Sequence, residues 1–313
     1  MTGYILRRLG TSLILVIVVT FITFLLLSTS FESVARRLLG DSATPESLTA
    51  MMTKLGYDRP LLVQYGDWLW GAVRGDFGSS VYSGLDVAST VIQRLGVTLS
   101  LIIPALLITV IISVALGVWA ASRGGAADRV AQVVSLIGYI VPGLLLAIVL
   151  VYVFAVTLRW LPATGYTPIA DNVGGWIRSI TLPVIVLVVA SVASMTSQVR
   201  GTMVDELRKD YVRTMRTRGV PSGSIVFRHA LRNAAGPALT VMSLEFMAMF
   251  GAALIIENVF GLPGIGSFGF NSALQADVPM LLGLTVFSVL MVTVVNLATD
   301  LVNAWLNPKV KLS

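Results

Sequence analysis

Six long apolar runs, separated by polar connections, set the pattern of this chain of 313 residues. A helix that crosses the hydrocarbon core of a bilayer needs about 20 predominantly apolar residues. The runs that meet this length are Leu9–Phe31, Leu95–Ser122, Val130–Leu158, Ser179–Val199, Asn233–Ile256 and Val278–Thr299. Glu245 is the only ionisable residue inside them. The pattern therefore predicts an all-α polytopic membrane protein with six transmembrane helices.

The distribution of basic residues predicts the orientation of these helices. The two ends of the chain and the two connections on the same side carry 14 lysines and arginines, whereas the opposite connections carry eight. Eight of the 14 lie in one connection, residues 200–236. By the positive-inside rule, both termini and this loop are cytoplasmic. The net charge of +6 thus reflects topology and not a nucleic-acid surface.

Composition supports the membrane class and removes several kinds of chemistry. Charged residues make up only 12% of the chain, against about 25% in soluble domains. Cysteine is absent and His229 is the only histidine, so neither a thiolate nucleophile nor a zinc site is expected. No G-K-[ST] triplet is present, so the chain has no Walker A loop. We expect a non-catalytic protein without metal or cofactor.

The connections divide the chain into three regions. Residues 1–31 form the N-terminal tail and the first helix, which is too long for a typical signal peptide and is interpreted as a retained anchor. Residues 32–94 form an outer region. There, Thr44, Pro45 and Gly56 frame one short helix, and a second amphipathic stretch runs from Pro60 to about Arg74. Residues 95–313 form the five-helix core.

A glycine-rich stretch after the fifth run matches a nucleotide-binding pattern by spacing alone. Residues 264–269 read G-x-G-x-x-G, but they follow an apolar helix and Pro263, and not a strand. We interpret the match as fortuitous. The whole connection from Glu257 to Pro279 is expected to be an external segment of irregular backbone beside a pore mouth, or else a flexible loop.

The cytoplasmic connection holds the most informative local pattern. Leu207, Tyr211, Thr214 or Met215, and Arg218 recur at helical spacing, and Gly219 supplies the residue that ends a helix. A short amphipathic helix in a polar loop can dock in a groove of another protein. The same residues are also consistent with a basic loop that only maintains topology. Periodicity does not separate these two interpretations.

Resemblance to a known family does separate them. The residues Asp210-Tyr211-Val212-Arg213-Thr214, with Gly219 after them, resemble the EAA loop of permease subunits in ATP-binding-cassette (ABC) importers. The segments 229–237, 257–266 and 307–309 are similar to the dipeptide/oligopeptide branch of that family. The similarity spans essentially the whole chain and is strongest to the first of the two permeases, which carries the large outer loop. At the third EAA position, which is usually small, this chain has Met215.

The resemblance implies a function, a set of partners and a location. The chain would form half of a translocation pathway with a second homologous permease, in a bacterial inner membrane. Two cytoplasmic ATPase subunits, separate or fused, would hydrolyse ATP, and an extracytoplasmic binding protein would deliver substrate. The implied ATPase-docking residues are Asp210, Tyr211, Val212, Arg213, Thr214, Met215, Arg216, Thr217, Arg218 and Gly219. Relatives of this branch carry dipeptides, oligopeptides, glutathione or metal chelates, so the substrate stays open.

The substrate pathway is expected to include Glu245, Glu257 and Asn258. Glu245 lies near the middle of the fifth run, where a carboxylate facing lipid would cost several kcal/mol. It could attract the ammonium of a peptide, or it could hold the partner permease through a hydrogen bond. A buried carboxylate would also suit an ion-coupled secondary transporter, which is the alternative function. That alternative does not require the long cytoplasmic loop.

Overall fold

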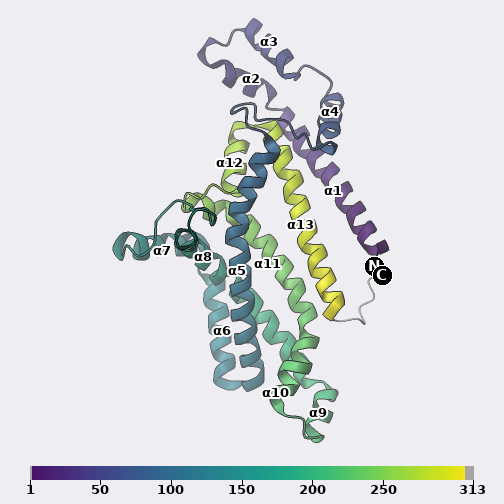
Figure 1. Cartoon of the computed structure of the whole chain (residues 1–313), viewed down its shortest axis with the longest axis vertical. Helices are drawn as coiled ribbons and strands as arrows, with labels where there is room; N and C mark the ends of the chain where they lie inside the picture. Colours follow the sequence, from purple (N-terminus) through teal and green to yellow (C-terminus); the bar gives the residue numbers. More distant parts are fainter. Residues whose placement is uncertain (1, 307–313) are drawn as a thin grey trace. The chain divides into compact units, whose positions relative to one another are not determined.

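The structure is a computed structural model that describes residues 2–306. These residues form helices and connections without a named strand. The helices, labelled in Figure 1, are α1 (Thr2–Ser28), α2 (Phe31–Leu39), η1 (Gly40–Ser42), α3 (Pro45–Leu55), α4 (Leu61–Val73), α5 (Val87–Arg123), α6 (Gly125–Ile140), α7 (Gly143–Leu150), η2 (Val151–Thr157), α8 (Val173–Arg208), α9 (Asp210–Thr217), α10 (Ser222–Ser224), η3 (Ile225–Ala230), α11 (Leu231–Val259), α12 (Ile265–Gln275) and α13 (Val278–Leu306). The predicted all-α class is confirmed.

Five helices in the described part of the chain are long and apolar enough to cross a membrane. The predicted third span is different, because α6 and α7 meet at a 92° bend. Val141 is extended there, with φ −77° and ψ 112°, as expected for a residue that precedes a proline. Pro142 is the N-cap of α7, with φ −64° and ψ 127°, and the helix begins at Gly143. The uninterrupted helix predicted over Val130–Leu158 was therefore wrong, and a sixth span exists only if the bent pair is counted as one.

The chain forms two compact units. Unit 1 contains residues 1–96 and 264–294, and unit 2 contains residues 97–263 and 295–313. In unit 1, the buried core consists of Phe24, Phe31, Tyr65, Val278 and Leu282. The hydroxyl of Tyr65 lies 2.9 Å from Thr20 Oγ1, and this contact ties α4 to α1.

The outer region of unit 1 follows the predicted local signals. Thr44 caps α3 in a reciprocal capping box with Ser47, Pro45 occupies the first turn, and Gly56 ends the helix at φ +71°. The second predicted helix is α4. One boundary was wrong, since α1 ends at Ser28 and Phe31 starts a further helix.

The glycine-rich connection is also more regular than predicted. Residues 265–275 form α12, and Gly264 precedes its first turn. The irregular backbone and the flexible loop predicted for these residues were wrong, whereas their location beside a pore mouth stays a prediction. A dinucleotide-binding G-x-G-x-x-G stretch joins a strand to a helix. Here the stretch lies at the start of α12 and follows no strand, so the match is fortuitous, as predicted.

Unit 2 is organised around α8, which packs against α6 and α11. Two glycines permit close approach of its neighbours. A Cβ on Gly138 of α6 would lie 2.7 Å from the Cβ of Ala193, and one on Gly117 of α5 would lie 2.7 Å from Val199 Cγ1. Contacts through small residues are typical of membrane helix packing. At one end of α8, Arg200 Nη2 donates to Asp128 Oδ2 at 2.8 Å, which joins α8 to α6.

Candidate functional site

The segment with the EAA-like pattern forms a separate helix, α9, beyond the end of α8. The chain leaves α8 at Arg208, and Lys209 adopts an extended conformation, with φ −66° and ψ 150°. The helix restarts at Asp210, an acidic residue that suits the positive end of the helix dipole. The predicted short helix is confirmed. Leu207 was assigned to it wrongly, because it belongs to α8 and packs against the core of unit 2.

The end of α9 is set by backbone hydrogen bonds. Val220 N–H donates to Met215 O at 3.0 Å, and Gly219 N–H donates to Arg216 O at 3.1 Å. This is the Schellman pattern, which requires a left-handed residue at the position of Gly219. The φ of Gly219 is +74°, as the sequence predicted. Pro221 follows and gives the chain a new direction before α10.

One face of α9 is fixed to the rest of unit 2. Val212 is fully buried, whereas Tyr211 is half-buried. The hydroxyl of Tyr211 donates to Glu206 Oε2 at 3.4 Å and accepts from Asn233 Nδ2 at 3.3 Å. Lys209 Nζ also donates to Glu206 Oε1, at 2.9 Å. Through these contacts α9 is connected to both α8 and α11.

The charges of this cluster shift the ionisation of its members. The hydrogen bond from Lys209 to the Glu206 carboxylate raises the pKa of Lys209. Burial raises the pKa of Tyr211, and the nearby Glu206 carboxylate acts in the same direction. At neutral pH the lysine is therefore charged and the phenol protonated, which is the state that the hydrogen bonds require.

The opposite face of α9 is exposed and basic. The exposed residues are Asp210, Arg213, Thr214, Arg216 and Thr217, followed by Arg218 and Gly219, with Met215 half-buried beside them. None of the three arginines forms an ion pair within residues 2–306. Figure 1 shows α9 and α10 together at one end of unit 2. A buried anchor and an uncompensated basic face make α9 a candidate docking element.

The three predicted pathway residues do not form one cluster within this chain. Glu245 is half-buried in the middle of α11. Glu257 is fully buried and accepts a hydrogen bond of 2.5 Å from Thr98 Oγ1. The side chain of Asn258 is exposed, and its amide donates to Leu254 O at 2.7 Å. Glu245 and Glu257 are 12 positions apart on α11, which corresponds to about 18 Å along the helix, so their carboxylates lie in different surroundings.

Sequence reasoning missed several residues that position this site. Glu206 and Asn233 hold Tyr211, and the ion pair of Asp128 with Arg200 joins α6 to α8 nearby. The spacing of Glu206 and Lys209, three residues apart at a helix end, was the one local signal available. The remaining contacts join positions far apart in the sequence.

Two family models together cover nearly the whole chain. Residues 113–312 match the family model described as binding-protein-dependent transport system inner membrane component, and residues 1–102 match the model of the N-terminal part of such membrane components. The probable peptide ABC transporter permease protein y4tP of Sinorhizobium fredii is 35% identical over 309 residues, which cover 98% of this chain and 99% of that protein. The oligopeptide transport system permease protein AppB of Bacillus subtilis is 30% identical over 315 residues, covering 99% and 100%.

A solved structure shares the fold. The inward-facing MetNI methionine ABC transporter contains a chain that superposes with a TM-score of 0.56, at 13% sequence identity. The match covers 69% of this chain and 96% of that one. At this identity the likeness concerns the fold alone.

Proposed function

The chain belongs to the family of binding-protein-dependent transport system inner membrane components, and from this premise we propose that it carries peptides as half of the pathway of an ABC importer. It is a multi-pass inner-membrane permease subunit. Its full-length relatives carry names that refer to peptides and oligopeptides. These names support a peptide substrate for this chain. No comparison favours the ion-coupled alternative.

In this proposal, α9 couples the chain to its ATPases. The observation that carries the assignment is a helix held inward by buried Val212 and presenting Arg213, Arg216 and Arg218 outward. ATP-driven closure of two ATPase subunits would push α9. Because Tyr211 connects α9 with Glu206 of α8 and Asn233 of α11, movement of α9 would pass to both spanning helices.

The same proposal places the remaining partners. Both chain ends and residues 200–236 lie in the cytoplasm, a second homologous permease completes the pathway, and an external binding protein delivers the peptide. The C-terminal segment 307–309, which contributed to the family resemblance, lies outside the described residues. Hydrolysis of ATP belongs to the partner subunits.

Reconstituted transport tests this function. The chain, the second permease, the ATPases and the binding protein are placed together in liposomes, and uptake of a labelled peptide is measured. We expect uptake that requires ATP and the binding protein and that persists when ionophores abolish all ion gradients. Uptake driven by a proton or sodium gradient without ATP would contradict the proposal.

Glu245 is proposed to contact the peptide ammonium within the pathway. Its half-buried position in the middle of α11 supports a role that faces protein or water, because exposure of a carboxylate to lipid is costly. The Glu245→Gln variant keeps the size and hydrogen bonding of the side chain. We expect it to lose the preference for a free peptide over the same peptide with an acetylated N-terminus, while complex assembly is retained. An unchanged preference would instead favour a contact with the partner permease.

A further inference from the structure

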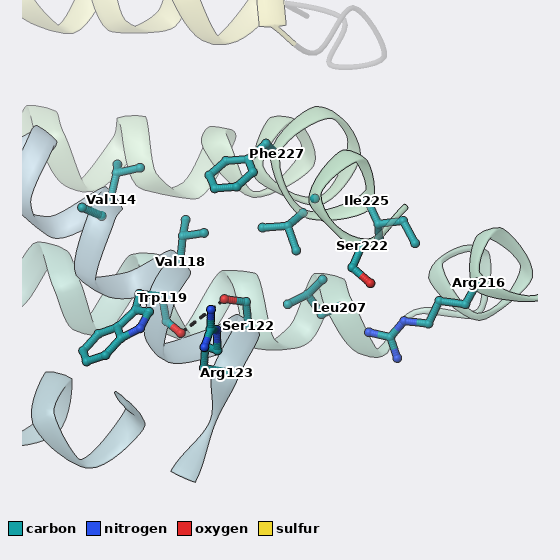
Figure 2. A pocket seen from close by; sticks show the side chains of 13 residues that line it. Val114, Val118, Trp119, Ser122, Arg123, Leu207, Arg216, Ser222, Ile225 and Phe227 are labelled. Atoms are coloured by element: carbon teal, nitrogen blue, oxygen red, sulfur yellow. Dashed lines mark hydrogen bonds between the residues drawn. The ribbon is translucent and has the colours of Figure 1, made fainter. Parts of the chain in front are cut away.

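A cavity of about 680 Å³ lies between the end of α5 and the start of the long helix that contains α10, η3 and α11. One wall is the last part of α5, including Val114, Val118 and Trp119. The opposite wall includes Ile225 and Phe227. Figure 2 shows Phe227 on one side of the cavity and Val114 and Val118 on the other. The cavity lies wholly within unit 2.

Two arginines are among the residues that line this cavity. Arg123 is the last residue of α5, and Arg216 belongs to α9. Both are exposed, and neither forms an ion pair with any acidic residue that the structure describes. In Figure 2, Arg216 reaches from α9 toward the other lining residues. The cavity thus combines an apolar interior with a doubly cationic rim.

The position of the cavity along α5 restricts what can fill it. From Val114 to Arg123 the helix rises about 14 Å, and all of the first nine residues belong to the apolar run that is interpreted as membrane-spanning. Trp119 lies near the end of that run, where tryptophan is typical of a membrane–water interface. An occupant must therefore offer an apolar part within the bilayer and an anionic part at its cytoplasmic surface.

We propose that this cavity binds one anionic phospholipid, with an acyl chain along Val114, Val118 and Trp119 and the headgroup phosphate at Arg123 and Arg216. Basic pockets between helices on the cytoplasmic side are suited to anionic headgroups. A segment of a soluble ATPase would meet the arginines but would have to insert into the bilayer to reach Val114. The placement of this end of α5 in the cytoplasm rests on the orientation proposed above.

The bound lipid would connect two moving parts. The cavity is lined by residues of α5, by Leu207 of α8, by Arg216 of α9 and by the start of the α10–α11 helix. A lipid held there would contact both the coupling helix and the spanning helices that it is proposed to move. Coupling between the ATPases and the pathway would accordingly depend on the anionic lipid content of the membrane.

Quenching of tryptophan fluorescence tests lipid occupancy directly, because Trp119 lines the cavity. The complete transporter is placed in nanodiscs of three parts phosphatidylcholine to one part phosphatidylglycerol. The same amount of brominated lipid is used each time, either all of the phosphatidylglycerol or an equal amount of the phosphatidylcholine. We expect brominated phosphatidylglycerol to quench more than brominated phosphatidylcholine. This selective component should vanish in Trp119→Phe, which identifies the reporting residue among all tryptophans of the complex.

Substitutions separate the headgroup contact from general charge. In Arg123→Gln or Arg216→Gln, the phosphatidylglycerol concentration that gives half of the selective quenching should rise about fivefold. In the double variant it should rise roughly 30-fold. Arg129→Gln is the matched control, because Arg129 is an exposed arginine of α6 that does not line the cavity, and it should change nothing. Ala115→Phe, which narrows the apolar part of the cavity without adding a tryptophan or changing the charge, should also reduce the selective component.

Three outcomes would overturn the proposal. Equal quenching by the two brominated lipids would mean ordinary annular lipid. Equal weakening by Arg129→Gln would mean a diffuse surface potential. A photo-crosslinker at position 115 that captures an ATPase or the second permease, with no lipid quenching, would mean a protein occupant. Because the quenching needs neither ATP nor peptide, these outcomes do not depend on whether the proposed transport function is correct.

Discussion

Replacing Gly219 with alanine would isolate the effect of one backbone angle on coupling. Gly219 has φ +74°, and a Cβ added there would meet no atom within 4 Å. The substitution therefore introduces no clash with a neighbouring element. Its cost arises from the left-handed conformation, which is unfavourable by about 1–2 kcal/mol for residues with a Cβ. A change of that size shifts the ratio of capped to frayed α9 by roughly 5- to 30-fold.

Two measurements on the assembled transporter follow this shift. Amide hydrogen exchange of residues 210–220 should become faster, because the hydrogen bonds from Gly219 and Val220 to α9 are weakened. Stimulation of ATP hydrolysis by the loaded binding protein should fall. Insertion of the chain in the membrane should not change, because the spanning helices are untouched. Asparagine at position 219 should retain part of the stimulation, since it tolerates the left-handed region better than alanine.

Gly201→Ala provides the matched control. Gly201 also has no atom within 4 Å of an added Cβ, but it lies inside α8 with an ordinary φ. Alanine favours a helix there by about 1 kcal/mol, so stimulation should be preserved. Full stimulation in Gly219→Ala, or an equal loss in Gly201→Ala, would refute the argument that the helix end controls coupling.

Three further predictions concern single residues. Val212→Ala removes two buried methyl groups and should destabilise α9 by about 1.5–3 kcal/mol, detected as faster hydrogen exchange and weaker ATPase stimulation. Val73→Ala removes the same two methyl groups from an exposed position at the end of α4 and should have neither effect. Ala276 is held at φ +55°, so Ala276→Gly should relieve about 1 kcal/mol of backbone strain and raise the thermal unfolding temperature. Ala273→Gly, inside α12, should lower that temperature. The opposite order of the two unfolding temperatures would contradict the strain at Ala276. Burial raises the pKa of Tyr57 to about 12, so its stabilising contribution as a neutral phenol is complete below pH 10 and is lost as the pH rises through about 12. An ultraviolet difference titration against Tyr57→Phe should show this late ionisation, and a midpoint near 10 would contradict it.

Local chemistry explains why so much of α9 was predictable. A Schellman ending needs only a residue that tolerates positive φ after an amphipathic turn, and both are visible in the sequence around Gly219. The spanning helices were predictable for a similar reason, because the bilayer sets their length and excludes charge. The bend at Pro142 was also present in the sequence, but continuous hydrophobicity hid it, since an apolar run does not reveal whether its backbone is interrupted.

Contacts between distant positions could not be predicted in this way. The assignment of Glu257 to the substrate pathway stays a prediction, but nothing in the sequence indicated that this residue is buried and hydrogen-bonded to Thr98, 159 residues away. The anchoring of Tyr211 by Glu206 and Asn233 depends on how α8, α9 and α11 pack together.

The sequence by itself determined the class of the protein, most of its spanning segments, and the place and ending of α9. Hydrophobic length, charge asymmetry and helix capping all act over short stretches of chain. Only the tertiary structure decided which charges are buried or paired, and which meet around a cavity. Arg123 and Arg216 illustrate the difference, since they lie on separate helices and share the rim of one cavity only after α5, α8 and α9 have packed. Packing among distant residues depends on the shape of every side chain between them, and no local pattern records it.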